Sequence, residues 1–261
     1  MTAMRPFLTS AAVLAAAWAS VAEMPRPGPV CVWTFDHGSL RDEAGRGRDQ
    51  LSAFTNAGAV VLPRFVTADD VAGVQGKAVA LGATPDDAAY LAACTSPDVR
   101  LGPSYSVAIR FHPLKLGTWA RLVLRWGPGL EHAYHVAVHN GQASLYHGQA
   151  DGTEAICEGG KVEAGRWHVM VAVAERNDAQ PAKSALRVYL DGTCAATVAY
   201  DGTWRATVGE GLGIGDSASS PGEQTRFVGF VDEVMLWNRA LSADEVAALA
   251  APAASRVGPP R

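Results

Sequence analysis

The chain has 261 residues, of which 48% are hydrophobic and 18% are charged, and its formal net charge is −4. This mild acidity argues against sequence-independent binding of nucleic acid, which needs a strongly basic surface. The apolar fraction is large enough for a substantial core, and the length is ordinary for one β-sandwich domain.

The N-terminal segment is predicted to be a signal peptide. Arg5 gives a positively charged start, and residues 7–18 form an apolar stretch that is too short to span a bilayer. Small residues before and at Ala22 suit cleavage there, so we expect residues 1–22 to be removed. A Pro-rich linker at 23–29 argues against a buried helix at the start of a domain. We therefore expect a secreted protein, or one held in the periplasm or cell envelope, without a membrane span.

The four cysteines predict disulfide bonds, because an even number of cysteines in an exported chain usually pairs. Three connectivities are open, and we favour Cys31 with Cys94 and Cys157 with Cys194, which keeps the closed loops local. Zinc is the alternative. The chain has no C-x-x-C pair, which argues against tetrahedral ligation by cysteines.

Apolar residues recur with a period of two along most of the chain, which predicts β-strands. The pair Asn140–Gly141 is a strong hairpin signal between two of these strands. Asp-Gly pairs that begin at 151, 191 and 201 predict further turns. The expected strands are 104–111, 119–126, 133–139, 167–175 and 184–191.

One helix is expected near the C-terminus. Ser242 can cap it, Glu245 completes a capping box, and Leu241 and Val246 are placed for a hydrophobic staple. Residues 251–261 are expected to form a disordered tail. Many short strands and one late helix predict an all-β fold, a two-sheet antiparallel jelly-roll β-sandwich with one short C-terminal helix.

Alternation also predicts which side chains face away from the core, and many of these are basic or aromatic. If their strands belong to one sheet, these side chains would form a shallow, positively charged surface that also carries aromatic rings. Such a surface suits anionic glycans, because arginine pairs with carboxylate or sulfate and rings stack on sugar faces. The alternative is that they are ordinary polar residues of an outward sandwich face. The candidate ligand-binding residues are Arg110, Trp119, Arg121, Arg125, His135, His139, Tyr146, Arg187 and Tyr189.

Two adjacent carboxylates, Asp232 and Glu233, interrupt an apolar stretch. In a regular strand they face opposite ways, as do Val231 and Val234, so one carboxylate is expected to be partly buried. A buried carboxylate needs backbone donors, an arginine or a metal ion.

The segment "FVGFVDEVMLWNRALSADEVAAL" resembles the C-terminal signature of bacterial laminin-G-like jelly-roll domains, relatives of the concanavalin A-like lectins and glucanases. Further segments resemble other parts of that family in the same order. The resemblance covers roughly residues 30–250 and implies one jelly-roll domain over that range. The further segments are 32–49, 76–82, 166–175, 186–193 and 211–217.

The resemblance also implies a place for a metal ion. In such sandwiches the first and last strands lie side by side, so Asp36 is expected to approach Asp232. Together they would hold a structural Ca²⁺, a hard cation that prefers oxygen ligands. The alternative is that Asp232 accepts backbone N–H bonds and fixes the opening loop. No other cofactor is expected.

The resemblance and the signal peptide imply a secreted, non-catalytic recognition module that binds a glycan or an extracellular protein. One alternative is a divergent polysaccharide hydrolase or lyase that uses outward Arg and His residues. Another is a structural or adhesive envelope protein without a small ligand. The Glu-x-Asp-x-x-Glu strand of the glucanases is absent from the sequence, and no catalytic residue is assigned.

Overall fold

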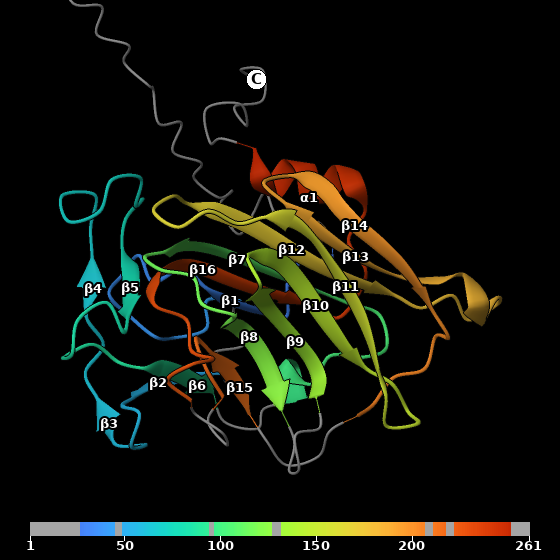
Figure 1. Cartoon of the computed structure of the whole chain (residues 1–261), viewed down its shortest axis with the longest axis horizontal. Helices are drawn as coiled ribbons and strands as arrows, with labels where there is room; N and C mark the ends of the chain where they lie inside the picture. The colour runs from blue at the N-terminus through green and yellow to red at the C-terminus, as the bar shows by residue number, and fades with distance from the viewer. Residues whose placement is uncertain are drawn as a thin grey trace, which may run out of the picture.

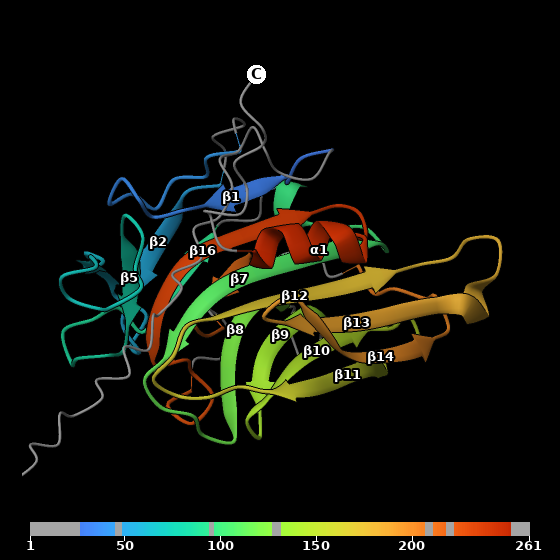
Figure 2. The same ribbon diagram turned by 90° about the horizontal axis from the view of Figure 1, so that it is seen from above.

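The computed structural model describes residues 27–44, 49–93, 97–126, 132–206, 211–217 and 222–251. Two eight-stranded sheets, whose named strands pair antiparallel, stack face to face, and helix α1 (Ala243–Ala250) lies on the outside of one of them (Figures 1 and 2). The expected all-β sandwich with a short C-terminal helix is therefore confirmed. The predicted signal peptide (1–22) lies outside the described residues, as do most of the linker and of the tail.

Sheet A runs in the order β14-β13-β12-β7-β16-β5-β4, and β1 pairs with β16. The last strand in sequence, β16, therefore sits inside the sheet between β7 and β5. Its strands are β1 (Cys31–Trp33), β4 (Phe65–Val66), β5 (Ala78–Leu81), β7 (Tyr105–Pro113), β12 (His168–Glu175), β13 (Ser184–Leu190), β14 (Thr193–Tyr200) and β16 (Gly229–Trp237).

Sheet B runs in the order β11-β10-β9-β8-β15-β6-β2-β3. Its strands are β2 (Leu51–Phe54), β3 (Val60–Val61), β6 (Tyr90–Ala93), β8 (Trp119–Trp126), β9 (His132–His139), β10 (Gln142–Gly148), β11 (Glu154–Lys161) and β15 (Leu212–Ile214). Two short 3₁₀ helices, η2 (Pro97–Val99) and η4 (Pro181–Lys183), lie in connections.

Every strand expected from the alternation is present, with ends that differ by at most two residues. The expected hairpin is also present, between β9 and β10. Asn140 and Gly141 have φ values of 49° and 74°. Positive φ at both central residues is the geometry of a type I′ turn, which explains the Asn-Gly pair. Asp191 and Gly192, between β13 and β14, repeat it with φ values of 50° and 82°.

The main core lies between the two sheets and takes one face of each strand. In β7 the inward residues are Val107, Ile109 and Phe111, as the alternation predicts. In β16 the alternation fails, because Val231 and Val234 both enter the core. A bulge between Val231 and Glu233 adds one residue to this strand and reverses its faces.

Helix α1 begins with the expected capping box. The Ser242 hydroxyl accepts a hydrogen bond from the Glu245 backbone, and the Glu245 carboxylate accepts one from the Ser242 backbone. Leu241 and Val246 are buried together on the outer face of sheet A, which confirms that both pack at the helix entry. Within the described residues, no helix has the length and apolar character needed to span a bilayer.

The expected disulfides are not formed. Cys31, Cys157 and Cys194 are free thiols, and Cys94 lies outside the described residues. Cys157 points into the core, where its Sγ lies 3.6 Å from the Leu186 carbonyl oxygen, whereas Cys194 is exposed. The two thiols therefore lie in different environments. Their closeness in sequence, for which we favoured this pair, does not bring them into disulfide geometry.

Candidate ligand-binding face

The nine candidate residues divide between the two sheets, so they do not form the single surface that the alternation suggested. Strands β7 and β8 follow one another in sequence but belong to opposite sheets. Sheet A carries Arg110, Arg187 and Tyr189. Sheet B carries Trp119, Arg121, Arg125, His135, His139 and Tyr146.

Arg110 is committed to a buried ion pair. It is 2% exposed, and its Nη1 donates to the Asp232 carboxylate. Its Nη2 donates to the Gly73 carbonyl oxygen at 2.6 Å, and its guanidinium carbon lies 4.4 Å from the centre of the Trp167 ring. Burial lowers the pKa of Arg110, and the nearby Glu233 carboxylate opposes that shift. Its contacts are therefore structural.

The ion pair also explains the two adjacent acids of β16. Glu233 stands opposite Arg110 in the strand register, and the bulge lets Asp232 reach the same guanidinium. Asp232 is 2% exposed. A buried carboxylate needs backbone donors, an arginine or a metal ion, and here the partner is an arginine. Asp36 accepts a hydrogen bond from the Lys77 backbone at 3.2 Å. The calcium ion between Asp36 and Asp232 stays a prediction.

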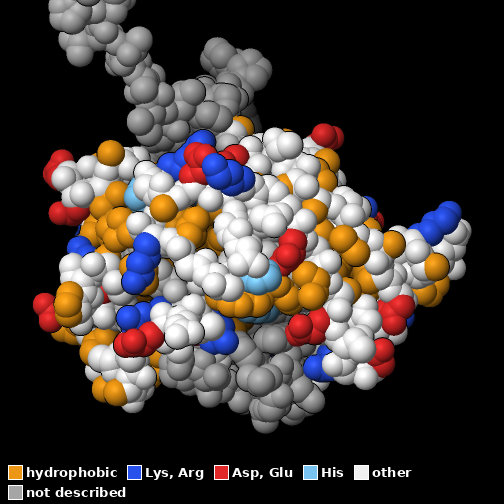
Figure 3. Space-filling view, viewed as in Figure 1, with side chains coloured by type: hydrophobic (Ala, Val, Ile, Leu, Met, Phe, Trp, Pro, Cys, Tyr) orange, Lys and Arg blue, Asp and Glu red, His pale blue; other side chains and the backbone are white. Residues whose placement is uncertain are grey.

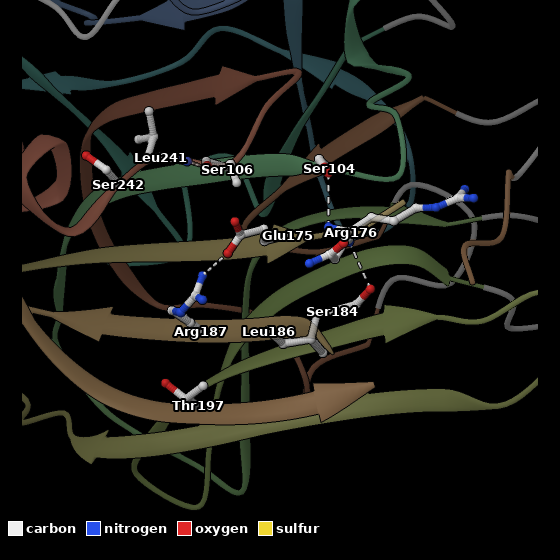
Figure 4. A network of polar contacts seen from close by, with 12 residues as sticks. Ser104, Ser106, Glu175, Arg176, Ser184, Leu186, Arg187, Thr197, Leu241 and Ser242 are labelled. Carbon is white, nitrogen blue, oxygen red and sulfur yellow. Dashed lines mark hydrogen bonds and ion pairs between the residues drawn. The ribbon is translucent and has the colours of Figure 1, made fainter. Parts of the chain in front are cut away.

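Arg187 and Tyr189 are also occupied by contacts on sheet A. Arg187 forms an ion pair with Glu175 across β13 and β12, at 2.6 Å (Figure 4). Tyr189 is 5% exposed and belongs to the apolar cluster beneath α1. The outer face of sheet A is therefore covered or paired at these positions.

Sheet B brings four candidate residues into one group, which we call the ring cluster: Trp119, His135, His139 and Tyr146. The Trp119 ring stacks on His139 with the ring centres 4.1 Å apart, and lies 5.8 Å from His135 and 5.2 Å from Tyr146. The cluster forms because Trp119 pairs with His139 across β8 and β9, and His135 pairs with Tyr146 across β9 and β10.

A carboxylate from the next strand completes the group. Glu158 on β11 accepts hydrogen bonds from the Tyr146 hydroxyl at 2.7 Å and from the His139 Nδ1 at 2.8 Å. The Asn140 amide donates to the other His139 ring nitrogen, which fits a neutral imidazole with its proton on Nδ1. Every polar group of this network therefore has a defined orientation.

The network shifts two pKa values. Burial alone would raise the pKa of Glu158, but the hydrogen bonds from Tyr146 and His139 outweigh it, and the pKa lies below its usual value. Burial and the hydrogen bond to Glu158 raise the pKa of Tyr146 well above its usual value. Glu158 is thus kept as a carboxylate and Tyr146 as a neutral phenol.

Part of this group is open to solvent. The His139 and Glu158 side chains are 23% and 27% exposed, and Trp119 is half-buried. Figure 3 shows histidine and apolar side chains gathered in the middle of this face, with an acidic group beside them. A surface hollow of about 470 Å³ adjoins Trp119, and Lys115, Glu223 and Arg226 help to line it.

The two remaining arginines of sheet B are buried. Arg121 is 8% exposed and pairs with Asp216 at 2.7 Å. Asp216 also accepts the backbone N–H groups of Ser217 and Gly222, so this carboxylate joins the two described segments that end at Ser217 and begin at Gly222. Arg125 is 1% exposed rather than outward-facing. A register shift between Arg121 and Val123 breaks the alternation on which that expectation depended.

Two residues of this face were missed by the sequence analysis. Glu158 lies in β11, whose residues alternate too weakly to predict a strand. Arg226 lies in a loop that meets β8 through a parallel bridge to Arg121. The Arg226 Nε is buried and has no hydrogen-bond partner among the described residues. Only the long-range pairing reveals it.

The fold defines a class of protein, the two-sheet antiparallel β-sandwiches. In this chain the outer face of one sheet carries a cluster of aromatic and histidine side chains. A family model described as "Concanavalin A-like lectin/glucanases superfamily", of the laminin G type, matches residues 85–247. The chain belongs to this family.

Solved structures share the fold at low sequence identity. Domain 4 of the extracellular GH43 arabinanase AbnA from Geobacillus stearothermophilus, in complex with arabinotriose, is 17% identical with a TM-score of 0.60, over 85% of this chain and 98% of that domain. The binding domain of Paraclostridial Mosquitocidal Protein 1 is 11% identical with a TM-score of 0.64, over 85% of this chain. This chain spans about half of that toxin domain, 51%. No curated protein sequence matches.

Proposed function

We propose that this protein is a non-catalytic recognition module that binds a glycan at the ring cluster. The observation that carries the proposal is the half-buried Trp119 ring, held by two histidines and Tyr146 beside the partly exposed Glu158. An aromatic ring offers its face to the C–H face of a sugar. The partly exposed Glu158 carboxylate beside the cluster can accept hydrogen bonds from sugar hydroxyls.

The rigidity of the group favours binding. The Trp119, His139 and Tyr146 side chains are already fixed by mutual stacking and by the Glu158 hydrogen bonds. A ligand that lands on preorganised side chains loses less of its binding energy to ordering them. The arabinotriose complex of the arabinanase domain, which has the same fold, gives a precedent for sugar binding by such a sandwich.

The hollow beside Trp119 favours an anionic sugar. Lys115 and Arg226 both line it, and the Arg226 Nε has no hydrogen-bond partner among the described residues. A uronate carboxylate or a sulfate would supply the missing acceptor, because guanidinium N–H groups form charge-assisted hydrogen bonds with the oxygens of both anions. Glu223 lies on the same wall and would disfavour a second negative charge at its side.

A lyase that would use Tyr146 as its base is disfavoured by the raised pKa of this residue. A lyase that removes a proton with a tyrosine needs a lowered phenol pKa, whereas burial and Glu158 raise the pKa of Tyr146.

The proposed location is outside the cytoplasm, following cleavage near Ala22. Protein recovered from the medium or periplasm would then give an N-terminal sequence that begins after that residue.

The first test is a binding titration with neutral and uronate-containing oligosaccharides, chosen from a glycan array. Trp119→Ala should weaken binding of every active sugar by at least about tenfold, because the stacking surface is lost. Arg226→Gln should weaken the uronate-containing sugars and leave the neutral ones unchanged. The matched control is Val198→Ala, which removes an exposed apolar side chain from β14 in the other sheet.

Two outcomes contradict the proposal. Unchanged binding by a folded Trp119→Ala variant would move the site elsewhere on the molecule. The absence of any binding across the array would favour a protein partner or a structural role. Release of a shorter or unsaturated product would instead establish an enzyme.

A further inference from the structure

A second cluster of chemically active side chains lies inside the sandwich, away from the ring cluster. Cys31 on β1 is 0% exposed, and Asp42 and Asp49, from the segment that follows β1, are 6% and 1% exposed. One sulfur or oxygen atom from each side chain can be chosen such that all three lie within 4.8 Å of one another. Three potential ligand atoms are therefore gathered in a site that excludes solvent.

Two carboxylate oxygens in this cluster have no hydrogen-bond donor. Asp42 Oδ1 accepts the backbone N–H groups of Val32 and Ala44 at 2.8 and 2.9 Å, but Asp42 Oδ2 is buried without a partner. Asp49 Oδ2 lies 3.6 Å from the Cys31 Sγ, and Asp49 Oδ1 is buried without a partner. Buried carboxylates so close together are costly unless a proton or a cation neutralises them.

The fold holds these side chains firmly. The Trp33 indole donates to the Asp49 carbonyl oxygen at 2.9 Å, and the Glu43 backbone donates to the Val32 carbonyl oxygen at 2.7 Å. A third bond, from the Leu51 backbone to the Leu40 carbonyl oxygen at 2.9 Å, closes the base of the loop. These three bonds fix the chain on either side of Asp42 and Asp49, and they leave Asp42 Oδ2 and Asp49 Oδ1 without partners.

We propose that Cys31, Asp42 and Asp49 form a buried site for a divalent metal ion, with Zn²⁺ the ion that fits the donors. Zn²⁺ accepts thiolate sulfur and carboxylate oxygen together, and three protein ligands with a fourth neutral ligand are a usual set. Ca²⁺ prefers oxygen donors alone, so the sulfur favours Zn²⁺. The thiol gives up its proton to solvent when the ion binds. The site is distinct from the Asp36 and Asp232 pair.

The test uses the full mature protein in a Cys194→Ser background, which removes the exposed thiol as a competing ligand. After treatment with a chelator, Zn²⁺ and Ca²⁺ are titrated separately, and the bound metal and the melting temperature are measured. The variants are Cys31→Ser and the isosteric Asp49→Asn. The matched control is Asp69→Asn, which alters an exposed carboxylate that belongs to neither proposed metal site.

The expected result is one Zn²⁺ per chain and a melting temperature several degrees higher than that of the chelated protein. Cys31→Ser and Asp49→Asn should each weaken Zn²⁺ binding by more than about 100-fold, beyond the roughly 10–100-fold that loss of an outer partner costs. Asp69→Asn should bind both ions like the parent. Co²⁺ in place of Zn²⁺ should give a thiolate charge-transfer band that Cys31→Ser abolishes.

Three results would overturn the proposal. The first is a parent protein that takes up no Zn²⁺ and melts at the same temperature with and without chelator, which needs no variant to be folded. The second is Zn²⁺ binding that Cys31→Ser and Asp49→Asn leave unchanged. The third is binding of Ca²⁺ but not of Zn²⁺, which would exclude the thiol from the ligands.

Discussion

Asp232 shows how the burial of one side chain can depend on a partner that is far away in the sequence. Its carboxylate is buried against Arg110, and the two side chains are 2% and 3% exposed. Removing one member of a buried ion pair leaves an uncompensated charge. We expect Asp232→Ala to lower the free energy of unfolding by about 3–5 kcal/mol, measured by urea denaturation. Replacing both residues by leucine should restore most of the loss, and a cost of Asp232→Ala below about 1 kcal/mol would contradict this account.

His147 is a buried histidine with both ring nitrogens engaged. Its Nε2 lies 2.9 Å from the Thr203 carbonyl oxygen, so it carries the proton, and Nδ1 accepts from the Tyr105 hydroxyl at 3.0 Å. Protonation would break the second bond, and burial lowers the pKa of His147 below its usual value. The unfolded chain therefore takes up a proton first as the pH falls below about 6.5.

This linkage predicts a pH dependence with a definite sign. Stability should be full above about pH 7 and should fall as the pH drops below about 6.5, by at most about 1.4 kcal/mol per pH unit for this one proton. His147→Gln should flatten that slope when unfolding is followed across the range. The exposed His37→Gln is the control and should keep the slope of the parent. Equal slopes in all three proteins would refute the assignment.

At the scale of single residues, alternation predicted the outward direction of Trp119, His135, His139 and Tyr146, and the structure brings these four together. It could do so because hairpins connect their strands and keep neighbours in register. It could not find Glu158 or Arg226, whose positions depend on pairing between strands and a distant loop.

At the scale of elements, the β9–β10 hairpin carries three members of the ring cluster. Gly141 in its turn has φ +74°, and a Cβ there would meet no atom within 4 Å. Gly141→Ala should therefore cost about 1–2 kcal/mol from backbone strain alone. Gly28 has equal space and no positive φ, so Gly28→Ala should be neutral in the same denaturation experiment. Equal effects of the two substitutions would show that the turn is not type I′.

Among the strands that the sequence predicted, the direction of the side chains was predicted least well where the strand has a bulge. In β8 and β16 an extra residue shifts the register, so Val123 and Val231 enter the core where strict alternation places other residues. In β16 the bulge cannot be recognised from the apolar residues, because helix α1 packs on the outer face of sheet A and this strand is apolar on both sides. The helix itself was predicted well, because its capping residues are local.

At the scale of the whole molecule, the sandwich and its family were predicted from short segments in the right order, and the match to the family over residues 85–247 confirms them. The distribution of the strands between two sheets was not predicted. That distribution separates Arg110, Arg187 and Tyr189 from the ring cluster. Which sheet a strand joins depends on contacts between residues far apart in the chain, and alternation contains no information about them.

The interior position of β16 has a consequence for how the chain folds. In sheet A, β16 joins β7 to β5 and also pairs with β1, so three earlier segments wait for the last strand. The hairpins β8–β9–β10 need no such partner and can form while the C-terminal residues are still being synthesised. The strands that carry the ring cluster would thus pair before the sandwich closes, and a chain that stops before Gly229 would expose the unpaired edges of β5 and β7.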